Sequence, residues 1–195
     1  MKTINIVTTN PVKHEIAVSH AQDYDVNIEM IDMETPEIQS LSVTEIAEYS
    51  AKYAAEKLQK PVLTTDAGMF IKALNGFPGP FIKYTNHFFT SVDYLRLMEG
   101  KVDRTLEWIE GIAYCEPGMD PVSVLNTVKG SLAFKAEGNA PGRDIQEIFI
   151  PEGKEKVGAL ISQNEMTEFW IKHVTAWEEL FLNLHKAGLI KKSLT

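Results

Sequence analysis

The sequence predicts a mixed α/β fold in one domain that covers residues 1–195. Three observations predict it: strand-like and helical segments alternate as far as Asp66, two long strand-like segments follow around a tight turn, and the chain closes with an amphipathic helical pattern. The alternation favours parallel strands with crossover helices, and the later pair favours an antiparallel hairpin. With 195 residues, 44% hydrophobic and 24% charged, the chain can bury one sizeable core.

A strand followed at once by a helix opens the chain. Residues 3–9 have a strand pattern, and residues 12–20 have a helical one. Asn10 is placed as the N-cap of this helix, and Pro11 suits its first position because a proline there gives up no hydrogen bond. The sequence therefore predicts a tight strand-to-helix turn at Asn10 and Pro11.

A second strand, a polar loop and a second helix lead to Asp66. The strand is expected at about residues 26–31 and the loop at residues 32–41. Ser42 and Glu45 have the spacing of a capping box, which marks the start of the helix. A third strand is expected to end at Asp66, so that its carboxylate emerges into a turn rich in glycine and proline.

The second half of the chain is predicted to contain a helix, two long strands, a loop and a final helix. The turn between the strands has the sequence PGMD, which is typical of a hairpin. These elements are expected at residues 88–98, 104–116, 121–135, 136–153 and 165–187, in that order.

Composition limits the kind of partner. Lys and Arg number 19 and Asp and Glu 27, which gives a formal charge of −8 and disfavours binding to a nucleic acid polymer. No run of about 18 apolar residues is present, and the N-terminus lacks the apolar core of a signal peptide, so we expect a soluble, cytoplasmic protein with no membrane partner. The single cysteine, Cys115, and the five histidines lack zinc-ligand spacing, so any metal would be bound by carboxylates.

Four polar residues fall at the ends of predicted elements: Asn10, Lys13, Glu37 and Asp66. The helix start at Asn10 and the ammonium of Lys13 could together bind a phosphate, although the chain has no P-loop. Glu37 and Asp66 offer the oxygen ligands that Mg²⁺ prefers. Two acids and a lysine are enough for metal-assisted attack on a phosphate ester. The alternative is structural: a helix cap, a solvated lysine and two turn residues.

Four blocks in this order resemble the inosine triphosphate pyrophosphatase family, also called Ham1-like or non-standard purine NTP pyrophosphatases. Residues 8–13 (TTNPVK) are similar to its T/S-x-N-x-x-K turn, and residues 36–39 (PEIQ) to its metal-binding loop. Residues 65–68 (TDAG) are similar to its D/E-D-T/S-G/C motif. Residues 73–84 (ALNGFPGPFIKY) resemble its A-L-x-G-x-P-G-P-Y-I-K-W block, which is the most specific of the four.

The resemblance implies an elongated mixed β-sheet in two lobes flanked by helices, with a central nucleotide cleft, usually as a homodimer. It also implies Mg²⁺-dependent hydrolysis of a nucleoside triphosphate between the α- and β-phosphates, with ITP, dITP and XTP as the first candidates. Lys13 and Asp66 would then be catalytic, and Glu37 and Asp66 would bind the metal. The implied substrate-binding residues are Thr8, Asn10, Lys13, Gly68, Phe149, Lys172 and His173.

The chain also departs from the family's pattern. Thr65 stands where the family has the first acid of its acidic pair, and Ser50 stands where a helix lysine is expected. Lys52 lies two residues further on, a rotation of roughly 200° around a helix, so it should not replace that lysine. The other residues of the phosphate half match the family's blocks, so this half of the site looks kept: Asn10, Lys13, Glu37 and Asp66.

The base half looks rewritten. Residues 142–149 (GRDIQEIF) lack the family's stacking aromatic and its Asp-Pro step, and its S-H-R motif falls on Ile171, Lys172 and His173. Base choice should therefore be altered or relaxed. Two alternatives stay open: a catalytically weak relative that binds nucleotide, and a phosphohydrolase of a non-purine substrate read by Arg143, Asp144, Lys172 and His173.

Overall fold

The computed structural model describes residues 1–193, and these fall into two compact units. Unit 1 comprises Met1–Asp66, Glu110–Asn126 and the chain from Trp170 onward, and unit 2 comprises Ala67–Ile109 and Thr127–Phe169. Strands are hydrogen-bonded in the order β2-β1-β3-β5-β6-β7, with β4 paired to β3. The two units share the residues of three strands: β3 (Val62–Ile71), β5 (Thr105–Cys115) and β6 (Val122–Leu132). The single domain over residues 1–195 stays a prediction.

Parallel strands form the start of unit 1, as the alternating pattern predicted. Strand β1 (Lys2–Val7) pairs in parallel with β2 (Val26–Ile31) along its whole length, and its other edge pairs with β3. The crossovers are made by α1 (Pro11–Ala21) and α2 (Val43–Leu58). The side chains of Ile4, Ile6, Val62 and Leu63 are fully buried, which places the core of unit 1 on these strands.

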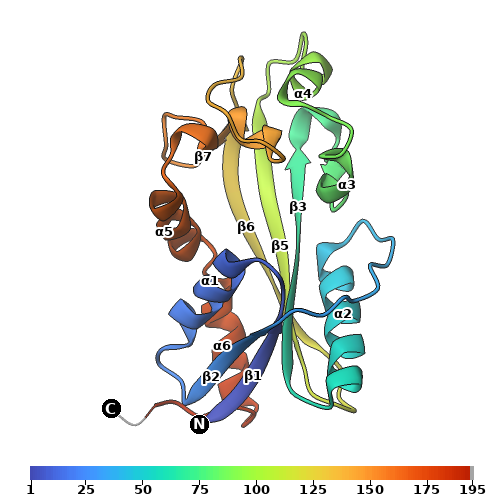
Figure 1. Ribbon diagram of the computed structural model, residues 1–195, viewed down its shortest axis with the longest axis vertical. Helices are drawn as coiled ribbons and strands as arrows, with labels where there is room; N and C mark the ends of the chain where they lie inside the picture. Colours follow the sequence, from blue (N-terminus) through green and yellow to red (C-terminus); the bar gives the residue numbers. More distant parts are fainter. Residues whose placement is uncertain (194–195) are drawn as a thin grey trace. The chain divides into compact units, whose positions relative to one another are not determined.

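Helix α2 lies on one side of the unit 1 strands, and α1 and α6 (Ala176–Lys186) lie on the other (Figure 1). The face of α2 toward the strands is made of small residues, which allow a close approach. This face packs on Val62, Ala113 and Cys115 and comprises Ala47, Ala51, Ala54 and Ala55. At Gly111 a Cβ would meet the Val43 carbonyl oxygen at 2.7 Å, so this strand position accepts only glycine beside the start of α2.

Unit 2 contains two short strands. Strand β4 (Pro78–Gly79) pairs antiparallel with the end of β3, and β7 (Phe149–Pro151) pairs antiparallel with β6. Short helices connect these strands, and α4 begins at a complete capping box of Thr90 and Asp93. The helices are η1 (Lys72–Leu74), α3 (Ile82–Thr85), α4 (Ser91–Leu97), η2 (Asp144–Glu147), η3 (Gly158–Leu160) and the first part of α5 (Gln163–His173).

The prediction that β3 ends at Asp66 is wrong. The strand continues to Ile71 because residues 69–70 find a partner in β4. Gly68 allows this pairing, since a Cβ on it would lie 2.7 Å from the Gly79 backbone. The block rich in glycine and proline therefore extends the strand by supplying its neighbour, and Asp66 lies inside the strand.

The prediction of one helix over residues 165–187 is also wrong. Helix α5 ends at His173 and α6 begins at Ala176. The side chain of Asn126 lies at the break: its Nδ2 donates to the His173 carbonyl and its Oδ1 accepts from the Ala176 N–H, both at 3.2 Å. These two bonds satisfy backbone groups that a helix break would otherwise leave without partners. Among residues 1–193, no helix is long and apolar enough to cross a membrane.

Candidate functional site

The turn between β1 and α1 is held by two side chains. The Asn10 Oδ1 accepts from the Val12 N–H at 3.0 Å, as expected of an N-cap, and the Thr8 Oγ1 accepts from the Asn10 N–H at 3.1 Å. The cap occupies the amide oxygen of Asn10, so its NH₂ is the group that can donate to an anion. The positive end of the α1 dipole lies at the same place.

Lys13 brings this turn to the motif at residues 65–68. Its Nζ donates to the Thr65 carbonyl at 3.2 Å, and the side chain keeps 26% of its surface exposed. Two blocks 52 residues apart in sequence therefore meet at one ammonium group. Next to Thr65 in β3 is Asp66, which is partly buried. A lysine and a carboxylate-bearing strand beside a helix start form an arrangement suited to a phosphate group.

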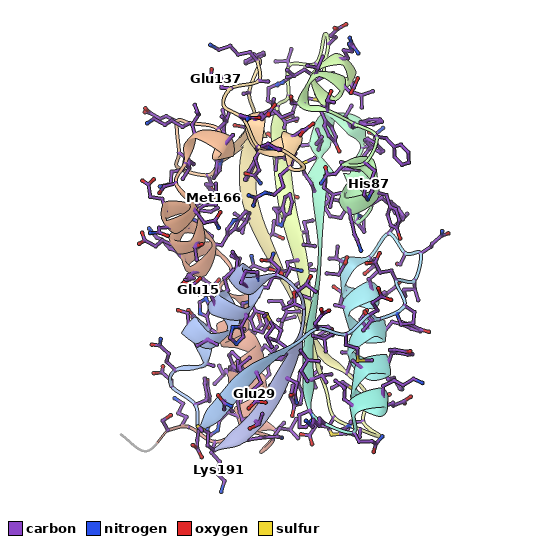
Figure 2. All side chains as sticks on the ribbon, viewed as in Figure 1. Glu15, Glu29, His87, Glu137, Met166 and Lys191 are labelled. Atoms are coloured by element: carbon purple, nitrogen blue, oxygen red, sulfur yellow. The ribbon has the colours of Figure 1, made fainter. Side chains whose placement is uncertain are left out.

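Glu110 was missed by the sequence analysis. Its Oε1 lies 3.9 Å from the Nζ of Lys13, and only 10% of its side chain is exposed. Burial raises the pKa of the Glu110 carboxyl, while the charge of Lys13 acts in the opposite direction. By contrast, Glu15 and Glu29 lie at the surface of unit 1 (Figure 2). Of the two glutamates in β5, Glu107 and Glu110, the second directly precedes the glycine and apolar residues at positions 111–115, and this placement was the signal that could have identified it.

The other predicted metal ligand, Glu37, is exposed in the loop between β2 and α2. Its role as a ligand stays a prediction. No group of three or more His, Cys, Asp or Glu side chains that could hold a metal occurs among residues 1–193. A Mg²⁺ ion at this site would therefore depend on one or two carboxylates, with substrate phosphates and water as its remaining ligands, which is a common arrangement for this ion.

The positions of Ser50 and Lys52 confirm that Lys52 does not replace the helix lysine of the family pattern. Ser50 is buried and its Oγ accepts from the Thr35 Oγ1 at 3.4 Å, so it joins α2 to the loop that carries Glu37. Lys52 instead pairs with Asp120 at 3.0 Å. A packing residue therefore occupies the position of the expected cation.

The other four residues predicted to bind substrate, Gly68, Phe149, Lys172 and His173, have different surroundings. Phe149 is 1% exposed, with its ring centroid 6.4 Å from that of Trp108 in the core of unit 2. Gly68 lies where β4 packs closely on β3, and a Cβ at this position would lie 2.7 Å from the Gly79 backbone. Lys172 is exposed, and the His173 carbonyl accepts the hydrogen bond from Asn126. The substrate contacts of all seven predicted residues stay predictions, and three of these residues, Thr8, Asn10 and Lys13, lie together where β1 passes into α1.

Comparison with known proteins gives a consistent result. The sequence model of the Ham1 family matches residues 4–174. A dITP/XTP pyrophosphatase of Methanopyrus kandleri is 38% identical over 179 residues, which are 92% of this chain and 94% of that protein. A protein of the same name from Methanothermobacter marburgensis is 32% identical, with coverage of 85% and 88%. The structure of a HAM1 protein from Coxiella burnetii superposes with a TM-score of 0.76 at 23% identity, covering 95% of this chain and all of the other.

Proposed function

This chain belongs to the Ham1 family, and we propose that it hydrolyses nucleoside triphosphates of non-standard purines to a nucleoside monophosphate and pyrophosphate. The names of its relatives make dITP and XTP the first substrates to test. The proposal rests mainly on one contact. The Nζ of Lys13, in the first turn of α1, donates to the carbonyl of Thr65, the residue before Asp66. Water would add across the bond between the α- and β-phosphates, and pyrophosphate would leave.

Each candidate site residue of unit 1 has a proposed role that follows from its position. The Asn10 NH₂ and the N-terminal end of α1 would bind a phosphate oxygen, and the ammonium of Lys13 would stabilise negative charge that develops there. Asp66 would accept a proton from the attacking water or orient it. Mg²⁺, when bound by Asp66 and Glu37 as proposed, would neutralise phosphate charge and polarise the phosphorus.

A binding protein without turnover is the second candidate function, and Thr65 favours it because this position lacks the acid of the family pattern. Assays of pyrophosphate release from dITP, XTP, ITP and the standard nucleotides, with and without Mg²⁺, test both candidates. We expect Mg²⁺-dependent release that Asp66→Asn reduces by about 100-fold or more. Lys52→Gln is the matched control, because Lys52 lies on the surface and pairs with Asp120, and we expect it to match the wild type.

Three outcomes would decide between the alternatives. Thermal stabilisation by dITP without any product would favour the binding protein. Equal rates when the purine is replaced by another group would favour a phosphohydrolase of a non-purine substrate. Unchanged release after Asp66→Asn would contradict the role of Asp66.

We also propose a homodimer located in the cytoplasm. The resemblance to the family supports the first of these statements. Light scattering on the purified protein tests the first, since a mass of about twice the 21.9 kDa chain is expected and the mass of one chain would contradict it.

A further inference from the structure

Glu110 is a buried acid that faces a cation. Only 10% of its side chain is exposed, and it lies in β5 just before five buried residues, at positions 111–115. A carboxylate in such surroundings loses most of its hydration, so proteins retain a buried charge where it has a partner. The partner of Glu110 is the ammonium of Lys13, whose Nζ lies 3.9 Å from the Glu110 Oε1.

The fold brings Glu110 and Lys13 to the same face of the unit 1 strands. A Cβ on Gly111 would meet the Val43 carbonyl oxygen, so position 111 faces α2. Side chains alternate between the two faces along a strand, and the neighbouring Glu110 therefore points away from α2. Helix α1, which carries Lys13, lies on that other side of the strands (Figure 1). The ion pair follows from this arrangement of the strand and the helix.

Two neighbouring strands fix the nitrogen atom of Lys13. Its Nζ donates to the Thr65 carbonyl of β3 at 3.2 Å, and Glu110 lies in β5, the next strand of the sheet. The 3.9 Å separation from Glu110 is too long for a hydrogen bond, so this carboxylate acts through its charge. A lysine ammonium has three N–H donors on a long, flexible stem. The Thr65 carbonyl accepts from one of them, and donors remain for a phosphate oxygen.

We propose that Glu110 is a positioning residue for the hydrolysis: its carboxylate holds the ammonium of Lys13 where the substrate phosphates bind. The inference rests on the proposed function. The negative charge of Glu110 opposes the binding of a triphosphate, because like charges repel. Its benefit therefore lies in the orientation of Lys13, since an ammonium that is fixed before the reaction stabilises developing charge better than a mobile one.

The alternative is that Glu110 only stabilises the fold. The two roles differ in how changes at Glu110 and Lys13 combine. If Glu110 acts through Lys13, its removal has no further effect on catalysis once Lys13 is absent. If Glu110 acts on the fold alone, the two losses of activity multiply.

The test compares single and double variants in dITP hydrolysis at saturating Mg²⁺, with kcat and KM measured separately. We expect Glu110→Gln to lower kcat by about tenfold without raising KM, because the ammonium is less well placed while repulsion of the phosphates decreases. Lys13→Met should lower kcat/KM by about 100-fold, and the double variant should also lie about 100-fold below the wild type, not about 1,000-fold. Glu107→Gln is the matched control, because Glu107 is a partly exposed glutamate of the same strand, and it should match the wild type.

Melting temperatures give a second readout that needs no turnover. Lys13→Met leaves the Glu110 carboxylate buried without this cation, so we expect a lower melting temperature than for the wild type. Adding Glu110→Gln to Lys13→Met should restore most of this loss, because the buried charge is then absent. Glu110→Met, with an apolar side chain of similar length, replaces Glu110→Gln in both measurements if the amide prevents folding.

Several results would overturn the inference: a wild-type kcat for Glu110→Gln, a raised KM with unchanged kcat, a double variant about 1,000-fold below the wild type, or no recovery of the melting temperature. A protein that folds with neither glutamine nor methionine at position 110 would assign Glu110 to stability and would overturn it too. If the wild type releases no pyrophosphate from any nucleotide, the proposed function is wrong and the inference falls with it. If the wild type is active and the two losses multiply, only the inference about Glu110 is wrong.

Discussion

Two asparagines in unit 1 each hold the start of a helix, but they use their side chains differently. Asn10 is exposed and uses its amide oxygen for the Val12 N–H. Asn126 is 5% exposed and uses both its oxygen and its nitrogen, for Ala176 and His173. Asn10 thus stabilises α1 with one group and keeps a donor for a ligand, whereas Asn126 is fully engaged in the fold. The same type of side chain thus leaves its NH₂ available at the start of α1 and uses all of its polar groups within the fold at the start of α6.

The largest expected effect is on stability, from Asn126→Asp. The aspartate would keep the acceptor for Ala176 but lose the donor to His173, and it would bury a charge. We expect the free energy of unfolding to fall by about 3 kcal/mol. Urea denaturation followed by circular dichroism measures it, and a loss below about 1 kcal/mol would contradict the buried role of Asn126.

Next in size is the effect of Lys13→Met on activity. Removing the ammonium leaves the phosphate without its nearby cation, and we expect kcat/KM to fall by about 100-fold or more. Steady-state pyrophosphate release measures the fall. A variant within a factor of about three of the wild type would show that Lys13 only pairs with Glu110 and takes no part in binding.

A smaller effect is expected from Asn10→Asp, the counterpart of Asn126→Asp. Aspartate is as good an N-cap as asparagine, so the stability of the protein should change by less than about 0.5 kcal/mol. The donor to phosphate is lost, and we expect kcat/KM to fall by about tenfold or more. A loss of stability in Asn126→Asp but not in Asn10→Asp would support the difference between the two asparagines. Equal losses of stability in both variants would contradict it.

The smallest effect is expected from Thr8→Val. This change removes only the acceptor for the Asn10 N–H in a partly exposed turn. Kcat/KM should fall by about threefold and stability by about 0.5–1 kcal/mol. Thr8→Ser, which retains the hydroxyl, is the control and should match the wild type in the same assays.

The two asparagines also show which parts of the fold could be predicted from the sequence. Asn10, Pro11 and the helix they begin are neighbours in the chain, so local spacing predicted the turn, and β2 was predicted with its observed ends. The break between α5 and α6 depends on Asn126, 47 residues before His173, and no pattern within the helix reveals it. The extension of β3 past Asp66 likewise depends on pairing with β4.

The candidate site follows the same division. Lys13 contacts the segment that carries Asp66, as two of the four blocks would require for one site, but this segment lies inside β3 and not at its predicted end. Glu110 could not be assigned to this site from its neighbours in the sequence, because its partner Lys13 is close in space but lies on α1, far from Glu110 along the chain. Phe149 was predicted to bind substrate from its place in a motif, but its near-complete burial depends on packing with Trp108, which the motif does not encode.

The position of bond cleavage tests the central claim most directly. Phosphorus-31 NMR of dITP treated with the purified protein and Mg²⁺ identifies the products. The account predicts dIMP and pyrophosphate in equal amounts, with formation greatly slowed by Lys13→Met. Release of orthophosphate with dIDP, or no product from dITP and XTP under the same conditions, would contradict it.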